Sequence, residues 1–98
     1  MRRIVICDTG PLLHLTESGA IHLLQLAGEV IIPPIVAKEF GENAPGIRLP
    51  DWVHTIDLDT ASAKKARDWA KHIHAGESAA IALSLQMQAD WLLAASSL

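Results

Sequence analysis

The sequence predicts an α/β fold, in which a short parallel sheet of about four strands is flanked by helices in three layers. Two observations lead to this prediction. Short apolar runs alternate along the chain with longer segments of helical periodicity. The first run, Ile4 to Cys7, is apolar at every position, which is typical of a strand buried on both faces. We expect residues 1–98 to form one domain, because a chain of this length holds a single core.

The first half of the chain predicts two strands that are each followed by a helix. After the first strand, Asp8 or Thr9 is the expected N-cap, and Pro11 suits the first helical turn. Gly28 and Gly41 are expected to end later helices. The expected elements are a helical segment at 12–16, a second at 20–26 with Ile21, Leu23 and Leu24 inward, a strand at 30–32 and a helix that enters at Pro33-Pro34 and runs through Phe40.

The second half begins with a loop at residues 43–51, which contains two prolines and a glycine. A third strand is expected at 52–58, and Asp59 is then expected to cap a helix. The next helix, from 77 to about 88, is rich in alanine and apolar on most sides, which indicates that it packs between other elements. A fourth strand is expected at 91–93.

Composition excludes several classes of protein. Half of the residues are hydrophobic and 19% are charged, which is typical of a globular chain and not of a disordered one. A net charge of -3 argues against a protein that coats nucleic acid. The single Cys7 suits a reducing compartment, so we expect a cytoplasmic protein. Arg2-Arg3 precede an apolar run too short for a signal peptide, and no run is long enough to span a membrane.

The tripeptide Asp8-Thr9-Gly10 raises the possibility of an aspartic protease. That enzyme needs an all-β scaffold and a glycine-rich hairpin that closes over the aspartate. More than half of this chain has helical periodicity, and no such hairpin is present in the sequence. We therefore reject this class and interpret Asp8 as an acid at the carboxyl end of the first strand, where open α/β sheets bind ligands.

Two further acids occupy comparable positions. Glu39 lies in the helix after the second strand, and Glu77 lies in the first turn of the helix that precedes the fourth. Carboxylates that converge at one end of a sheet repel one another unless a cation lies between them. Mg²⁺ or Mn²⁺, which prefer oxygen ligands, would suit such a site. Taken singly, Asp8 is also explained as an N-cap, Glu39 as a solvated helix acid and Glu77 as a helix-dipole partner.

The segments "DTGPLLHL", "VIIPPIVAKEF" and "AGESAAIALSLQMQADWLL" resemble, in order and spacing, the PIN-domain family, in particular VapC-like toxins and prokaryotic PIN-like proteins. The resemblance implies a metal-dependent ribonuclease, with Asp8, Glu39 and Glu77 as catalytic metal ligands and Thr9 in a supporting role. It also implies an RNA substrate, a possible antitoxin partner and a homodimer. The fourth acid that the family carries is absent near Ala95 or Ser96, so the chain looks C-terminally short, either as a natural form or as a truncated product.

Other features have simpler interpretations. His72 and His74 suggest zinc, but no second ligand pair accompanies them, so we interpret them as a helix end. Asp90 is interpreted as a turn residue with a small chance of supporting the site. A basic stripe with an alternative role along an RNA backbone is formed by Lys64, Arg67 and Lys71. Three aromatic side chains are expected in the core, namely Trp52, Trp69 and Trp91.

Two other functions stay open at this point. One is a catalytically inactive PIN-fold protein that dimerises or binds a partner, which the missing fourth acid favours. The other is a flavodoxin-like or receiver-like domain with Asp8 as phosphoacceptor. Receiver-like folds place the phosphorylated aspartate on a later strand, which this chain does not show.

Overall fold

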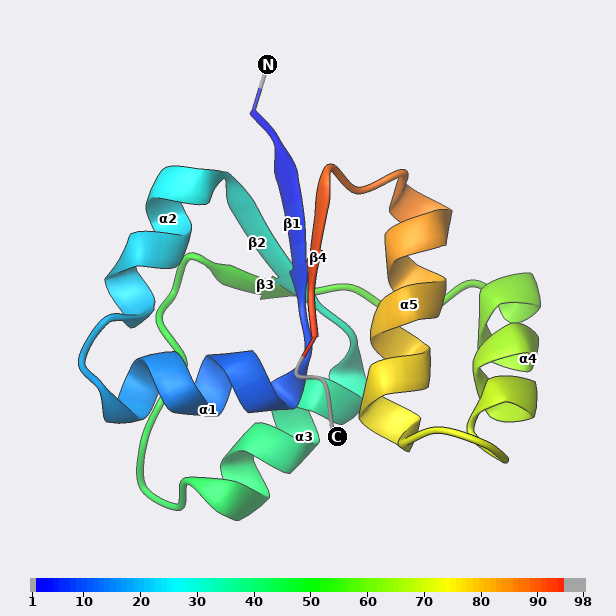
Figure 1. Ribbon diagram of the computed structural model, residues 1–98, viewed down its shortest axis with the longest axis horizontal. Coiled ribbons are helices and arrows are strands. Elements are labelled where there is room, and N and C mark those ends of the chain that lie inside the picture. The colour runs from blue at the N-terminus through cyan, green and yellow to red at the C-terminus, as the bar shows by residue number, and fades with distance from the viewer. Residues whose placement is uncertain (1, 95–98) are drawn as a thin grey trace.

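The computed structural model describes residues 2–94 and contains one four-stranded sheet (Figure 1). Its strands are β1 (Ile4–Cys7), β2 (Glu29–Ile32), β3 (Val53–Thr55) and β4 (Trp91–Leu93). They lie in the order β3-β2-β1-β4, and every neighbouring pair is parallel. The sheet confirms the predicted α/β class with four parallel strands.

Strand β1 lies between two partners and forms the centre of the fold. Ile6 pairs with Ile31 of β2 on one side and with Leu92 of β4 on the other. Val5, Ile6 and Cys7 have no exposed surface. The continuous apolar run therefore does form a strand that is buried on both faces.

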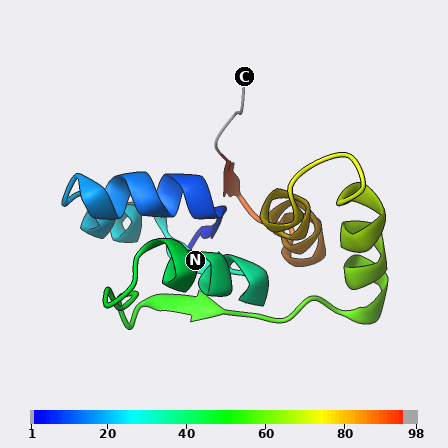
Figure 2. The same ribbon diagram turned by 90° about the horizontal axis from the view of Figure 1, so that it is seen from below.

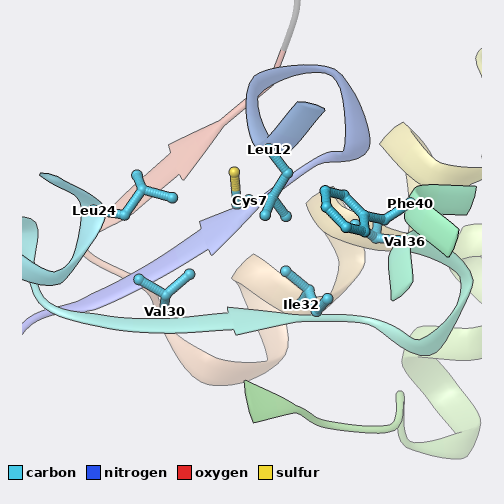
Figure 3. Close-up of a cluster of buried hydrophobic side chains, with 7 residues drawn as sticks. All are labelled: Cys7, Leu12, Leu24, Val30, Ile32, Val36 and Phe40. Atoms are coloured by element: carbon cyan, nitrogen blue, oxygen red, sulfur yellow. The ribbon is translucent and has the colours of Figure 1, made fainter. Parts of the chain in front are cut away.

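One face of the sheet is covered by the helical segments that follow β1 and β2. These are α1 (Thr9–Glu17), the 3₁₀ turn η1 (Ile21–Leu23), α2 (Leu24–Ala27) and α3 (Pro34–Asn43). Figure 3 shows the buried cluster that joins them to β1 and β2. Its members are Cys7, Leu12, Leu24, Val30, Ile32, Val36 and Phe40.

The opposite face is covered by α5 (Ala75–Met87), whose Ala80 and Leu83 pack against Ile6 and Ile31. Because alternate residues of a strand point to opposite faces, Ile6 and Cys7 belong to different clusters. Helix α4 (Thr60–Trp69) packs against α5 and lies beyond it, away from the sheet (Figures 1 and 2). The expected sandwiched position of the alanine-rich helix is thus confirmed.

The third strand is shorter than the predicted 52–58, because β3 is an edge strand that pairs only with the short β2. The Ile56 N–H donates to the Ile32 carbonyl at 3.1 Å, and the chain then leaves the sheet. Asp59 caps α4 as expected, since its carboxylate accepts a 2.7 Å hydrogen bond from the Ser62 N–H.

Gly41 does not end its helix, contrary to the prediction. Helix α3 continues past this residue. Gly41 is exposed, and a Cβ built on it would meet no neighbouring atom within 4 Å. The helix ends two residues later, where the Ala44 N–H donates to the Phe40 carbonyl at 2.8 Å. A helical glycine needs a left-handed backbone to act as a stop, and Gly41 does not have one.

Two side chains predicted to be inward are exposed. Leu23 is 50% exposed because Leu24 takes the inward position of this short turn. Trp91 is 52% exposed because it lies on edge strand β4. Trp52 and Trp69 are half-buried, and Trp52 packs against the buried cluster that contains Cys7 and Phe40.

Candidate functional site

Asp8 follows β1 at the carboxyl edge of the sheet and is anchored there through its backbone. Its N–H donates to the Leu93 carbonyl of β4 at 2.8 Å. Its carboxylate atom Oδ1 accepts a 2.7 Å hydrogen bond from the Thr9 N–H and so caps α1. The residue is only 8% exposed. The N-cap interpretation is therefore confirmed, and the capping role holds a buried carboxylate at the end of the central strand.

Glu39 reaches the same edge from α3. The hydroxyl of Thr9 donates a 2.8 Å hydrogen bond to Oε1 of Glu39, and this bond links the start of α1 to α3. Thr9 is itself 9% exposed. One threonine thus contacts both acids, through its backbone N–H for Asp8 and through its hydroxyl for Glu39.

The first turn of α5 completes the site. Gly76 is buried in this turn, and a Cβ built on it would lie 3.2 Å from Oδ1 of Asp8 and would overlap Oε1 of Glu39. The turn therefore approaches both carboxylates through bare backbone. Glu77 follows Gly76, and His74 is the N-cap residue of the same helix.

These residues line one pocket of about 210 Å³. All three acids proposed from the sequence, and Thr9, meet in it, although they come from three separate parts of the chain. The complete lining is Asp8, Thr9, Gly10, Glu39, His74, Gly76 and Glu77.

Burial raises the pKa of the Asp8 carboxyl above its usual 3.8. The Thr9 N–H opposes this shift, the negative charge of Glu77 reinforces it, and His74 lowers the pKa again. The ionised form of the Asp8 carboxyl is thus destabilised in the pocket, and a bound cation would stabilise it. The neighbouring Cys7 is not a reactive group, because burial and the charge of Asp8 raise its pKa to about 12.

The basic stripe is separate from the pocket. Lys64 and Arg67 are exposed on α4, and none of the three cations lines the pocket. Lys71 makes an exposed ion pair with Asp68 at 3.9 Å. Their role along an RNA backbone stays a prediction.

The family model DUF3368, described as a PIN domain, matches residues 4–95. The chain belongs to the PIN-domain family. No curated protein and no solved structure matches it. Membership indicates a nuclease-like fold and nucleic-acid binding, while the VapC-like subtype stays a prediction. No helix within residues 2–94 combines the length and hydrophobicity needed to cross a membrane.

The PIN-domain pocket fits a hard divalent cation in its donor chemistry. Three carboxylates line it, and the buried one has a raised pKa. Within residues 2–94, no three His, Cys, Asp or Glu side chains are grouped tightly enough to form a complete ligand cluster as they stand. Oε1 of Glu39 accepts a hydrogen bond from the hydroxyl of Thr9. The expected fourth position, at Ala95 or Ser96, lies outside the described residues.

Two residues that line the pocket are not among the candidates that the sequence offers. His74 is predicted to lie at a helix end, and Gly76 precedes the helix predicted from residue 77, yet both line the pocket. Their position next to Glu77 in the sequence is the signal that could have identified them. Asp90 has no supporting role there, because it binds the N–H of Ile4 at the opposite edge of the sheet.

Proposed function

We propose that this PIN domain is an Mg²⁺- or Mn²⁺-dependent endoribonuclease that hydrolyses RNA phosphodiesters. The observation that supports the proposal is the convergence of Asp8, Glu39 and Glu77 on one pocket, with Asp8 buried and its pKa raised. A buried carboxyl group with a raised pKa that shares a pocket with two further acids favours a functional site over a purely structural one. Membership of a nuclease-like family points to the same chemistry.

The three carboxylates would hold the ion, which would supply an activated water and stabilise charge on the phosphate. Asp8 provides the rigid ligand, because its backbone is hydrogen-bonded to β4 and its carboxylate to the Thr9 N–H. Thr9 keeps the Glu39 carboxylate in the pocket through its hydroxyl. His74 lines the same pocket, where it lowers the pKa of Asp8.

RNA would reach the pocket over the surface of the domain, where Lys64, Arg67 and Lys71 offer contacts to the phosphate backbone. A nuclease of this kind suits the toxin of a toxin-antitoxin pair, with an antitoxin protein as its inhibitor. We propose the toxin role and the antitoxin partner from the family resemblance alone.

A second candidate function is a catalytically inactive PIN domain that forms a homodimer or binds a protein. One observation favours it: Leu26 and Trp91 are 83% and 52% exposed and line a groove together, at the amino edge of the sheet. Exposed apolar side chains that share a groove are typical of an interaction surface.

Cleavage of a mixed pool of structured RNA separates the two functions. The purified protein should cut the pool with Mg²⁺ or Mn²⁺, and should stop cutting in EDTA or when it carries Asp8→Asn. The matched control is Asp90→Asn, which changes an aspartate with the same type of backbone hydrogen bond at the other edge. No cleavage by the folded wild-type protein would favour the inactive alternative.

A further inference from the structure

We propose that Gly76 is a positioning residue of the metal site, and that its missing side chain creates the space in which the Glu39 carboxylate lies. This inference rests on the proposed function, because it concerns the same three acids. It assigns a role in metal affinity to a residue that has no ligand atom of its own.

The space at Gly76 is filled by the acids themselves. A Cβ at this position would overlap Oε1 of Glu39, and would lie 3.1 Å from its Cδ and 3.2 Å from Oδ1 of Asp8. Gly76 is buried in the first turn of α5, so no solvent gap separates the helix from the carboxylates. The closest atoms are therefore those of the two acids that would bind the ion.

The same oxygen of Glu39 has a second contact. Oε1 accepts the 2.8 Å hydrogen bond from the Thr9 hydroxyl and is also the atom that a Cβ on Gly76 would overlap. A methyl group at residue 76 cannot share this space. It would displace the Glu39 carboxylate and disturb its hydrogen bond from the Thr9 hydroxyl, and the ion would lose a preorganised ligand.

The backbone at residue 76 does not itself require glycine. Its φ does not lie in the left-handed region, and it belongs to an α-helix, in which alanine is favoured over glycine. The overlapping atoms belong to the end of a flexible side chain, so the glutamate would give way and the helix would stay in place. Gly76→Ala should therefore alter the site and leave the fold intact.

Gly41→Ala is the matched control. Gly41 is also a helical glycine, yet a Cβ there would meet no other atom within 4 Å. Mn²⁺ binding by the full chain, measured by calorimetric titration, is the readout, with circular dichroism and thermal unfolding in EDTA as checks on folding. Gly76→Ala should weaken Mn²⁺ binding by about tenfold or more, the size expected when the support of a ligand is lost. Gly41→Ala should bind Mn²⁺ as the wild-type protein does.

A double-mutant cycle tests whether Gly76 acts through Glu39. Once Glu39→Gln has removed the carboxylate charge, adding Gly76→Ala should weaken Mn²⁺ binding by much less than it does alone. Equal Mn²⁺ affinity of Gly76→Ala and wild type would overturn the inference, as would losses that multiply fully in the double variant. An unfolded Gly76→Ala protein would overturn it as well, because the glutamate would then not be the group that gives way. A wild-type protein that binds no Mn²⁺ would instead reject the proposed function, and this inference with it.

Discussion

Two aspartates flank strands at opposite edges of the sheet, and each accepts a 2.7 Å hydrogen bond from a backbone N–H. Asp8 binds the N–H of Thr9 at the carboxyl edge, and Asp90 binds the N–H of Ile4 at the amino edge. Their surroundings differ. Asp90 is exposed, whereas Asp8 is 8% exposed and shares its pocket with Glu39 and Glu77.

A local capping role therefore neither marks a functional acid nor excludes one. The sheet is fully parallel, so the carboxyl ends of its strands meet at one edge, where segments distant in sequence can gather ligands. The amino edge instead carries a groove lined by Arg2, Arg3, Leu26 and Trp91, among others. We expect the two edges to differ in function as they do in composition.

The largest effect is expected from the two aspartates themselves. Asp8→Asn should lower the rate of RNA cleavage by more than about 100-fold, because loss of a direct ligand should exceed the 10–100-fold typical of outer groups. Asp90→Asn should leave the rate within about twofold, since an amide oxygen can still accept the Ile4 N–H. Initial rates on one RNA substrate measure both. Similar losses in the two variants would remove the distinction between the edges.

The next largest effect is expected when the Thr9 hydroxyl is removed. Thr9→Val keeps the shape of the side chain but removes the hydroxyl that binds Glu39, so Mn²⁺ affinity should fall by about tenfold. Thr9→Ser retains the hydroxyl and should bind Mn²⁺ nearly as tightly as wild type. The two affinities are compared by calorimetric titration. If Thr9→Val binds Mn²⁺ as tightly as the wild-type protein, the Thr9–Glu39 hydrogen bond does not support the metal site.

The raised pKa of Asp8 predicts a pH dependence of stability in EDTA. A carboxyl with a raised pKa in the folded state binds more protons when folded than when unfolded, so its contribution to stability is lost as the pH rises above 3.8 and through the folded pKa. Asp8→Asn cannot ionise, so its advantage over wild type should grow as the pH rises through this window. Urea denaturation across pH 3 to about 8 gives the two free energies of unfolding. A constant difference would mean that the pKa is not raised.

Asp90 should contribute to the stability of the fold and not to Mn²⁺ binding. Asp90→Ala removes the acceptor of the Ile4 N–H and should lower the free energy of unfolding by about 1 kcal/mol. Mn²⁺ affinity should not change, since the residue lies at the other edge. Urea denaturation and Mn²⁺ titration test the two halves of this prediction. A variant with weaker Mn²⁺ binding would show that the edges are coupled.

The smallest effect concerns the basic stripe. If Lys64, Arg67 and Lys71 contact phosphates, replacing all three by Ala should reduce the slope of log affinity against log salt by about 2, at about 0.7 for each contact to single-stranded RNA. Lys65→Ala is the control, because Lys65 is also an exposed cation of α4. An unchanged slope in the triple variant would mean that RNA does not follow this face.

The sequence was sufficient for the features that depend on short-range patterns. The apolar run before Asp8 indicated a buried central strand, and the strand–helix alternation placed Asp8 and Glu39 after consecutive strands. The cap at Asp59 also followed from residue type alone. These features are set by local propensity and by the periodicity of hydrophobic residues.

The features that the sequence did not predict depend on long-range packing. The length of β3 depends on its single partner β2, and the exposure of Trp91 depends on the position of β4 at the edge. The contact of Gly76 with Glu39 arises only when α5 packs beside α3. A single sequence does not report such contacts, which explains why Glu77 was identified as a candidate while Gly76 and His74, beside it, were not.

We propose that the carboxyl edge binds a divalent cation with Asp8 as its buried ligand. A calorimetric titration of the wild-type protein, Asp8→Asn and Asp90→Asn with Mn²⁺ at neutral pH tests this. We expect one strong site in the wild-type protein and in Asp90→Asn, and loss of that site in Asp8→Asn. Equal Mn²⁺ binding by all three proteins, or binding lost only in Asp90→Asn, would contradict it.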